Sequence, residues 1–116
     1  IGLAASGITP FTCAVLEQAH KAGALTIGIA NNADTALLAV AEHAIVLATG
    51  GESIAGSTRL KAGTAQKICL NMISSLIMVQ MRFVKDGLMA KMVPTNAKLR
   101  ARKKLIDAAL DKTPKS

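Results

Sequence analysis

Gly-Ser-Thr-Arg-Leu-Lys-Ala-Gly-Thr-Ala-Gln-Lys, residues 56–67, is the segment around which we interpret the rest of the chain. Ser57 and Thr58 are good N-cap residues, and Arg59 and Lys61 add positive charge, so the segment predicts a helix start that attracts anions. The apolar run from Ile68 to Val84 follows directly. We therefore expect one long helix over residues 57–84 whose apolar part is anchored in the core or in a dimer interface.

Upstream of this segment, short apolar runs alternate with helical patterns. Residues 1–5, 24–30 and 43–48 predict strands, and helices are expected after the first two of them. Thr9 is placed to cap the first helix, and Pro10 to occupy its first position. Strand–helix units of this length are typical of a parallel sheet, and continuous apolar strands indicate a sheet covered on both faces.

The C-terminal part predicts a turn and a further helix. Asp86-Gly87 is a turn sequence, and Pro94 or Thr95 is placed to open a helix that continues to Leu110. A chain that starts inside a buried strand resembles the C-terminal part of a larger domain, so we expect earlier strands to be missing. We predict that residues 1–90 form the C-terminal part of that domain and that residues 91–116 form a basic helical extension.

The net charge of +7 comes mostly from that extension. Residues 91–116 carry eight Lys and Arg against two Asp and Glu, whereas residues 1–90 carry six against five. No aromatic residue lies among the C-terminal charges, so base stacking is unsupported, and we predict no nucleic-acid partner. Polar residues interrupt the run from Ile68 to Val84, and we predict no membrane span.

Cysteine and histidine give no sign of a metal centre. Cys13 and Cys69 both lie in apolar helical patterns, which is typical of buried thiols in a reducing compartment. His20 and His43 have no further ligands at suitable spacing, so we predict no metal. The chain also lacks the glycine-rich loops that bind nucleotides.

Small polar loops follow each predicted strand, where ligands bind in parallel sheets. In the first loop the hydroxyls of Ser6 and Thr9, with N–H groups from Gly7 onward, resemble a phosphate cradle. Capped turns of this composition are also common without any ligand. Both interpretations stay open on the residues alone.

The sequence resembles a known family. Residues 5–10, Ala-Ser-Gly-Ile-Thr-Pro, are similar to the second Ser/Gly/Thr loop of SIS (sugar isomerase) domains, which bind phosphosugars. Residues 56–67 are similar to the signature of N-acetylmuramic acid 6-phosphate etherases, and residues 70–72, 87–89 and 95–99 continue the resemblance. It implies a three-layer α/β/α fold with a parallel, flavodoxin-like sheet, followed by C-terminal helices.

The resemblance also implies an activity. Such enzymes cleave the D-lactyl ether of N-acetylmuramic acid 6-phosphate to N-acetylglucosamine 6-phosphate and D-lactate, in bacterial cell-wall recycling. They use no cofactor; two Glu residues act as acid and base in an elimination followed by water addition. Both lie in the earlier part of the domain, so neither is placed in this chain. A cytoplasmic homodimer that binds a phosphorylated amino sugar is implied.

Site residues are carried over by position. Ser6, Gly7 and Thr9 match the phosphate loop, and the signature supplies Ser57, Thr58, Arg59 and Lys61. Glu52 matches a Glu common before the signature and is expected either to bind a sugar hydroxyl or to complement the helix dipole. Ile8 departs from the pattern, because such etherases often have Arg there. A non-catalytic phosphosugar-binding module and a phosphosugar isomerase of the same fold therefore remain alternatives.

Overall fold

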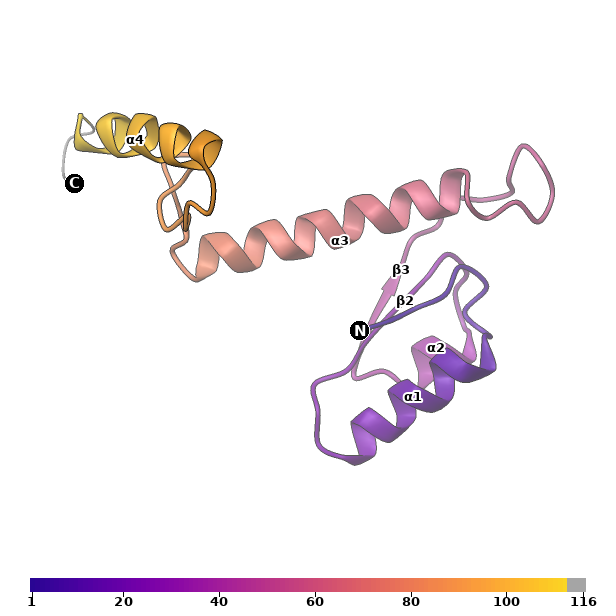
Figure 1. Ribbon diagram of the computed structural model, residues 1–116. Coiled ribbons are helices and arrows are strands. Elements are labelled where there is room, and N and C mark those ends of the chain that lie inside the picture. The colour runs from indigo at the N-terminus through magenta and orange to yellow at the C-terminus, as the bar shows by residue number, and fades with distance from the viewer. Residues whose placement is uncertain (113–116) are drawn as a thin grey trace. The chain divides into compact units, whose positions relative to one another are not determined.

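The computed structural model describes residues 1–112, in which two compact units follow one another, residues 1–70 and a second unit that begins at Asn71. In chain order the elements are β1 (Gly2–Leu3), α1 (Pro10–Lys21), β2 (Ile27–Ala30), α2 (Ala36–Ala39), β3 (His43–Val46), α3 (Lys61–Gln80), β4 (Val84–Lys85), β5 (Leu88–Met89) and α4 (Ala97–Asp111) (Figure 1). The predicted boundary at residue 90, between the domain and its basic C-terminal extension, stays a prediction.

The first unit is built on a three-stranded parallel sheet in the order β1-β2-β3. Gly2 pairs with Gly28, and the β2–β3 register pairs Ile27 with His43 and Ala30 with Val46. Helices connect successive strands, so the prediction of an α/β chain with a parallel sheet is confirmed. The strands are shorter than the apolar runs that predicted them.

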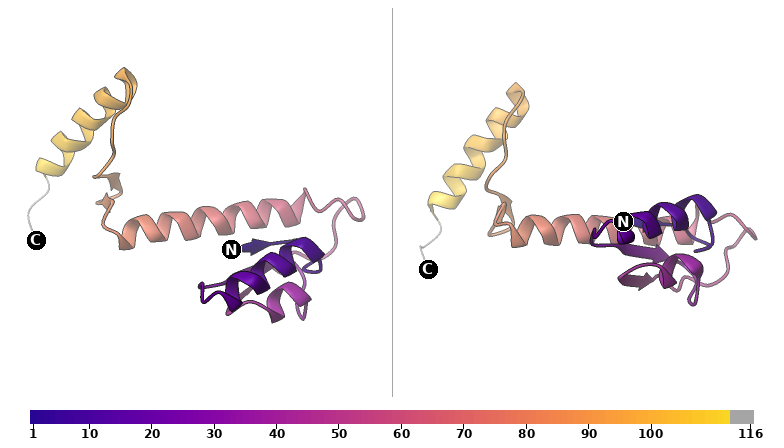
Figure 2. Two further views of the ribbon diagram at one scale, coloured as in Figure 1. Left: turned by 60° about the horizontal axis from the view of Figure 1, so that its bottom comes forward. Right: turned by 90° about the horizontal axis from the view of Figure 1, so that it is seen from below.

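The core of this unit lies between the sheet and the pair α1 and α2, which lie on the same side of the strands (Figures 1 and 2). Ala4, Leu16 and Leu37 form its centre, with Leu37 fully buried. At Gly28 a Cβ atom would lie 2.9 Å from the carbonyl oxygen of Leu37, so glycine allows α2 to approach the sheet closely.

β3 is the exception to the expected burial. His43, Ala44 and Val46 are exposed, and only Ile45 is partly covered. The expectation that both faces of every strand are covered is therefore wrong for β3. The physical reason is its position at the free edge of the sheet, where neighbours on one side are lacking within residues 1–112.

The long helix differs from its prediction in three ways. It starts at Lys61 rather than at Ser57 or Thr58, and it ends at Gln80 rather than at Val84. Ala62 is its one buried residue, so the expectation of a core helix within this chain is wrong. Exposed apolar side chains include Ile68, Met72, Leu76 and Val79. The apolar pattern predicts a helix that needs covering, but it does not identify the covering surface.

Among the described residues, α3 is also the one helix whose length and composition would allow it to cross a membrane. It is 20 residues long and apolar, and almost none of it is buried. Core helices of soluble proteins pass the same test of length and composition. The expectation of no membrane contact therefore stays a prediction.

The second unit contains a β-hairpin and α4. Asp86 and Gly87 have φ of 51° and 75° between antiparallel β4 and β5, which confirms the predicted turn. The last helix is also confirmed, but it starts at Ala97, because Asn96 and not Pro94 or Thr95 caps it: the Asn96 side chain accepts the N–H of Leu99 at 2.9 Å.

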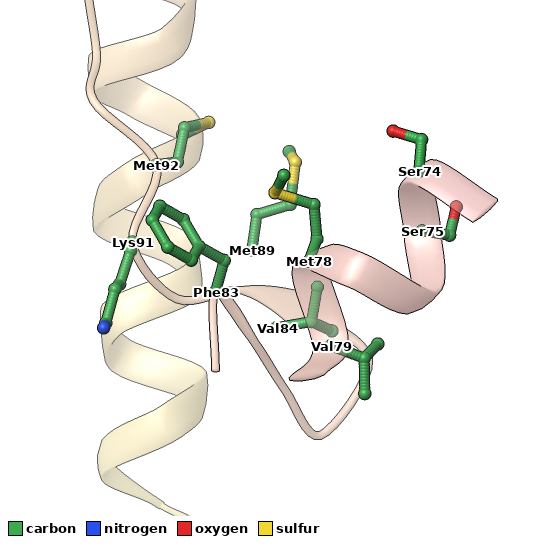
Figure 3. A pocket seen from close by; sticks show the side chains of 9 residues that line it. All are labelled: Ser74, Ser75, Met78, Val79, Phe83, Val84, Met89, Lys91 and Met92. Carbon is green, nitrogen blue, oxygen red and sulfur yellow. The ribbon is translucent and has the colours of Figure 1, made fainter. Parts of the chain in front are cut away.

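This second unit also has an open, apolar pocket of about 470 Å³. Figure 3 shows that the side chains of Met78, Phe83, Met89 and Met92 line it. The Lys91 ammonium lies 5.1 Å from the centroid of the Phe83 ring, a cation–π distance. None of the predicted site residues lies here, and the lining offers little that would recognise a phosphate.

Candidate functional site

Polar loops follow all three strands of the sheet, and hydrogen bonds between them hold the loops together. The backbone N–H of Asn31 and the side-chain amide of Asn32 both donate to the carbonyl oxygen of Ala5, each at 3.0 Å. The Asn31 amide also donates to the carbonyl oxygen of Leu47 at 3.1 Å. The ends of β1, β2 and β3 therefore meet at one edge, where parallel sheets usually bind ligands.

The Ser6–Thr9 loop turns tightly at Gly7. Gly7 has φ of 71°, its N–H donates to Ala4, and its carbonyl oxygen accepts the N–H of Leu37 at 2.9 Å. A Cβ atom on Gly7 would lie 2.2 Å from the Thr35 hydroxyl oxygen. Glycine is therefore required at this position both for backbone conformation and for space.

The N-terminal end of α1 is open. Thr9 occupies the N-cap position and Pro10 the first helical position, as predicted, but the Thr9 side chain makes no cap hydrogen bond. The first turn of α1 contains no acidic residue. Helices leave their first N–H groups without intrahelical partners, and the Ser6–Thr9 loop leads directly into this first turn. This end can accept an anion.

The N-terminal end of α3 is already occupied. The two carboxylate oxygens of Glu52 accept the N–H groups of Lys61 and Ala62, each at 2.9 Å. The next two N–H groups, of Gly63 and Thr64, donate to backbone carbonyl oxygens. These bonds explain why the prediction of Ser57 or Thr58 as N-cap is wrong: a carboxylate from upstream caps the helix instead.

The same contacts perturb the acidity of Glu52. The N–H of Ala62, and then that of Lys61, hold the pKa of the Glu52 carboxyl below its ordinary value of 4.5. Of its two expected roles, this geometry matches the acid that complements a helix dipole. A contact from Glu52 to a sugar hydroxyl stays a prediction.

The polar residues of the signature lie on the turns that precede α3. Thr58 and Arg59 are exposed, and Ser57 is half-buried. Lys61 is exposed, and no ion pair joins Arg59 or Lys61 to an acid within residues 1–112. These groups are free to meet a ligand, although the structure does not place them against the Ser6–Thr9 loop.

Sequence reasoning missed two residues of this edge. The Asn31 carbonyl oxygen accepts the side-chain amide of Gln66 at 2.8 Å, and its own amide lies 3.3 Å from the Thr49 hydroxyl. The available signal was a polar residue directly after a strand, together with a Gln inside residues 56–67. Among the described residues, no cluster of three His, Cys, Asp or Glu side chains could hold a metal ion.

Comparison with known proteins adds the family. No family model matches the chain. It is 49% identical over 108 residues to an N-acetylmuramic acid 6-phosphate etherase of Streptomyces coelicolor, which covers 93% of this chain and 35% of that protein. The proteins of the same name from Deinococcus radiodurans and Escherichia coli are 50% and 47% identical over 102 residues, which is 88% of this chain and 33% or 34% of theirs.

Fold and site together define a parallel α/β chain that has polar loops and the uncapped amino end of α1 at the carboxyl edge of its sheet. In sequence, this chain matches the C-terminal portion of the N-acetylmuramic acid 6-phosphate etherase family, and the predicted resemblance is confirmed. The chain spans about a third of the length of the curated relatives that it matches.

Proposed function

We propose that this chain contributes the phosphate-binding part of a SIS domain, in a carbon–oxygen lyase that cleaves the D-lactyl ether of N-acetylmuramic acid 6-phosphate. The products are N-acetylglucosamine 6-phosphate and D-lactate. High identity to proteins of that name over nearly the whole chain supports the reaction. The observation that carries the binding role is the contrast between the open end of α1 and the occupied end of α3.

The phosphate group is assigned to the Ser6–Thr9 loop. A dianion there accepts hydrogen bonds from the N–H groups of the first turn of α1 and from the hydroxyls of Ser6 and Thr9. The positive end of the helix dipole also stabilises its charge. No carboxylate competes for those groups in the first turn. Ser57, Thr58, Arg59 and Lys61 are assigned to the sugar side of the same ligand.

The proton transfers are assigned outside this chain. Abstraction of the weakly acidic C2 proton and protonation of the departing lactate need two acid–base groups. Glu52 is a poor candidate for either, because both of its oxygens already accept helix N–H groups and its carboxyl favours the ionised form. The complete enzyme is proposed to be a cytoplasmic homodimer that uses no cofactor.

The test uses the full-length protein that carries this chain. Incubation with N-acetylmuramic acid 6-phosphate is expected to release D-lactate, measured with a D-lactate dehydrogenase assay. Binding without lactate release would favour a non-catalytic module, which Ile8 in place of the expected Arg keeps as the second candidate. Isomerisation of another hexose phosphate without lactate release would contradict the lyase.

A further inference from the structure

Asn31 links more elements at the carboxyl edge of the sheet than its place in the sequence suggests. Its backbone N–H holds the end of β1 through Ala5, and its side-chain amide holds the end of β3 through Leu47. The same amide reaches the hydroxyl of Thr49, two residues further along the loop that follows β3. Its carbonyl oxygen receives the Gln66 amide from α3 at 2.8 Å.

The chemistry of these contacts fixes both side-chain orientations. The Leu47 carbonyl oxygen accepts hydrogen bonds only, so the Asn31 nitrogen must face β3 and its oxygen must face α3. Gln66 must then present its nitrogen to that oxygen. An Asp at position 31 would oppose the Leu47 oxygen, and a Glu at position 66 would oppose the Asn31 oxygen. The pair therefore requires two amides.

These bonds bracket the loop that carries Ser57, Thr58 and Arg59. Asn31 holds its start at Thr49, while Glu52 and Gln66 hold the helix that follows it. Gly50 and Gly56, both with positive φ, make the intervening backbone easy to deform. The position of the loop relative to the Ser6–Thr9 turn therefore depends on the contacts at its two ends.

We propose that Asn31 and Gln66 are positioning residues: without touching ligand, they hold residues 57–61 where those residues contact the sugar of a phosphosugar bound at Ser6 and Thr9. This inference rests on the proposed function. The expected consequence of breaking the pair is a selective loss of binding. Breaking the pair weakens binding of a sugar phosphate, which needs both segments, and leaves binding of inorganic phosphate, which needs the Ser6–Thr9 loop alone.

The experiment compares two variants with a matched control in the full-length protein. Gln66→Glu keeps the side-chain shape but places a carboxylate oxygen against the side-chain oxygen of Asn31. Gln66→Ala removes the contact while preserving helix propensity. Gln18→Ala, an exposed Gln on α1, is the control. Isothermal titration gives the Kd for N-acetylglucosamine 6-phosphate and for inorganic phosphate, and thermal unfolding gives Tm.

Loss of one hydrogen bond to a positioned segment is expected to raise the sugar-phosphate Kd about tenfold in the Gln66 variants. Inorganic phosphate is expected to change less than about twofold, and Gln18→Ala should change neither. Equal binding by variants and wild type would overturn the inference, as would parallel loss of both ligands with a lower Tm. A wild-type protein that binds neither ligand would refute the proposed function itself. The ratio of the variant Kd to the wild-type Kd tests only the positioning role of the pair.

Discussion

The carboxylate of Glu52 lies 2.9 Å from the amide nitrogen of Ala62, so a residue ten positions upstream caps α3. Its other oxygen makes the same contact with Lys61. We predict that Glu52→Ala frays the first turn of α3 and speeds hydrogen exchange at both amides, measured by NMR. Glu17→Ala removes an exposed ion pair with Lys21 and serves as the control, because its loss should leave those two amides unaffected.

The cap is also expected to depend on pH. The pKa of Glu52 is lowered in the folded protein, because the N–H groups of Ala62 and Lys61 favour the ionised form. A depressed pKa contributes stability above the unfolded value of 4.5, and that contribution is lost as pH falls through the folded value. Protection of the Ala62 amide should therefore decrease below about pH 4.5 and be independent of pH there in Glu52→Gln. Equal pH profiles for both proteins would contradict the assignment.

Gly7 tests whether the shape of the Ser6–Thr9 loop matters for folding. Gly7→Ala places a methyl group against Thr35 at a positive φ, so we expect a loss of about 2–4 kcal/mol in the free energy of unfolding. Gly23→Ala is the matched control, since Gly23 has φ of 80° and open space around it. It should lose only about 1 kcal/mol, the cost of the backbone conformation. Urea denaturation measures both, and equal losses would show that the contact with Thr35 is unimportant.

Thr→Val substitutions at two buried threonines compare the loss of a hydrogen-bonded hydroxyl with the loss of an unpaired one, by their effects on the free energy of unfolding. Thr26 is 1% exposed; its hydroxyl oxygen accepts the N–H of Glu42 at 3.0 Å and lies 3.4 Å from His20 Nδ1. Thr26→Val leaves that N–H unpaired and should cost about 1–3 kcal/mol. The Thr35 hydroxyl, also buried, has no hydrogen-bond partner among the described residues, so Thr35→Val should be nearly neutral in the same denaturation experiment.

The phosphate assignment makes a separate prediction about binding. Ser6→Ala combined with Thr9→Ala removes two hydroxyls that contribute little to the fold, since Thr9 makes no cap bond and Ser6 only a long contact of 3.4 Å with Ile8. We expect phosphate-ester affinity to fall at least about tenfold with almost unchanged Tm. Ser53→Ala, in the loop after β3, is the control. Unchanged affinity in the double variant would remove the assignment.

Local signals were the reliable part of the sequence. The helix start at Thr9 and Pro10, the turn at Asp86-Gly87 and the alternation of strands and helices all depend on neighbouring residues, and the structure confirms these three features. Ser57 and Thr58 have the same local preference for helix starts, yet α3 begins at Lys61. The contact with Glu52 outweighs that preference. Local helix propensity cannot predict a contact with a residue so far along the chain.

Longer-range features could not be predicted for the same reason. Gln66 and Asn31 are 35 positions apart, and only the folded sheet brings them together. The exposure of α3 depends on which surfaces surround it, and the apolar pattern of residues 68–84 carries no information about them. The binding roles proposed for the signature residues come from the family resemblance, not from their geometry.

The occupied end of α3 has a consequence for ligand valency. The amino end of α1 has no side-chain cap, whereas Glu52 occupies the amino end of α3 from within the chain. A sugar carrying two phosphates therefore finds one vacant helix end and one that it could use only by displacing a carboxylate. On the proposed phosphate assignment, we therefore expect a second phosphate on the same sugar to add no affinity.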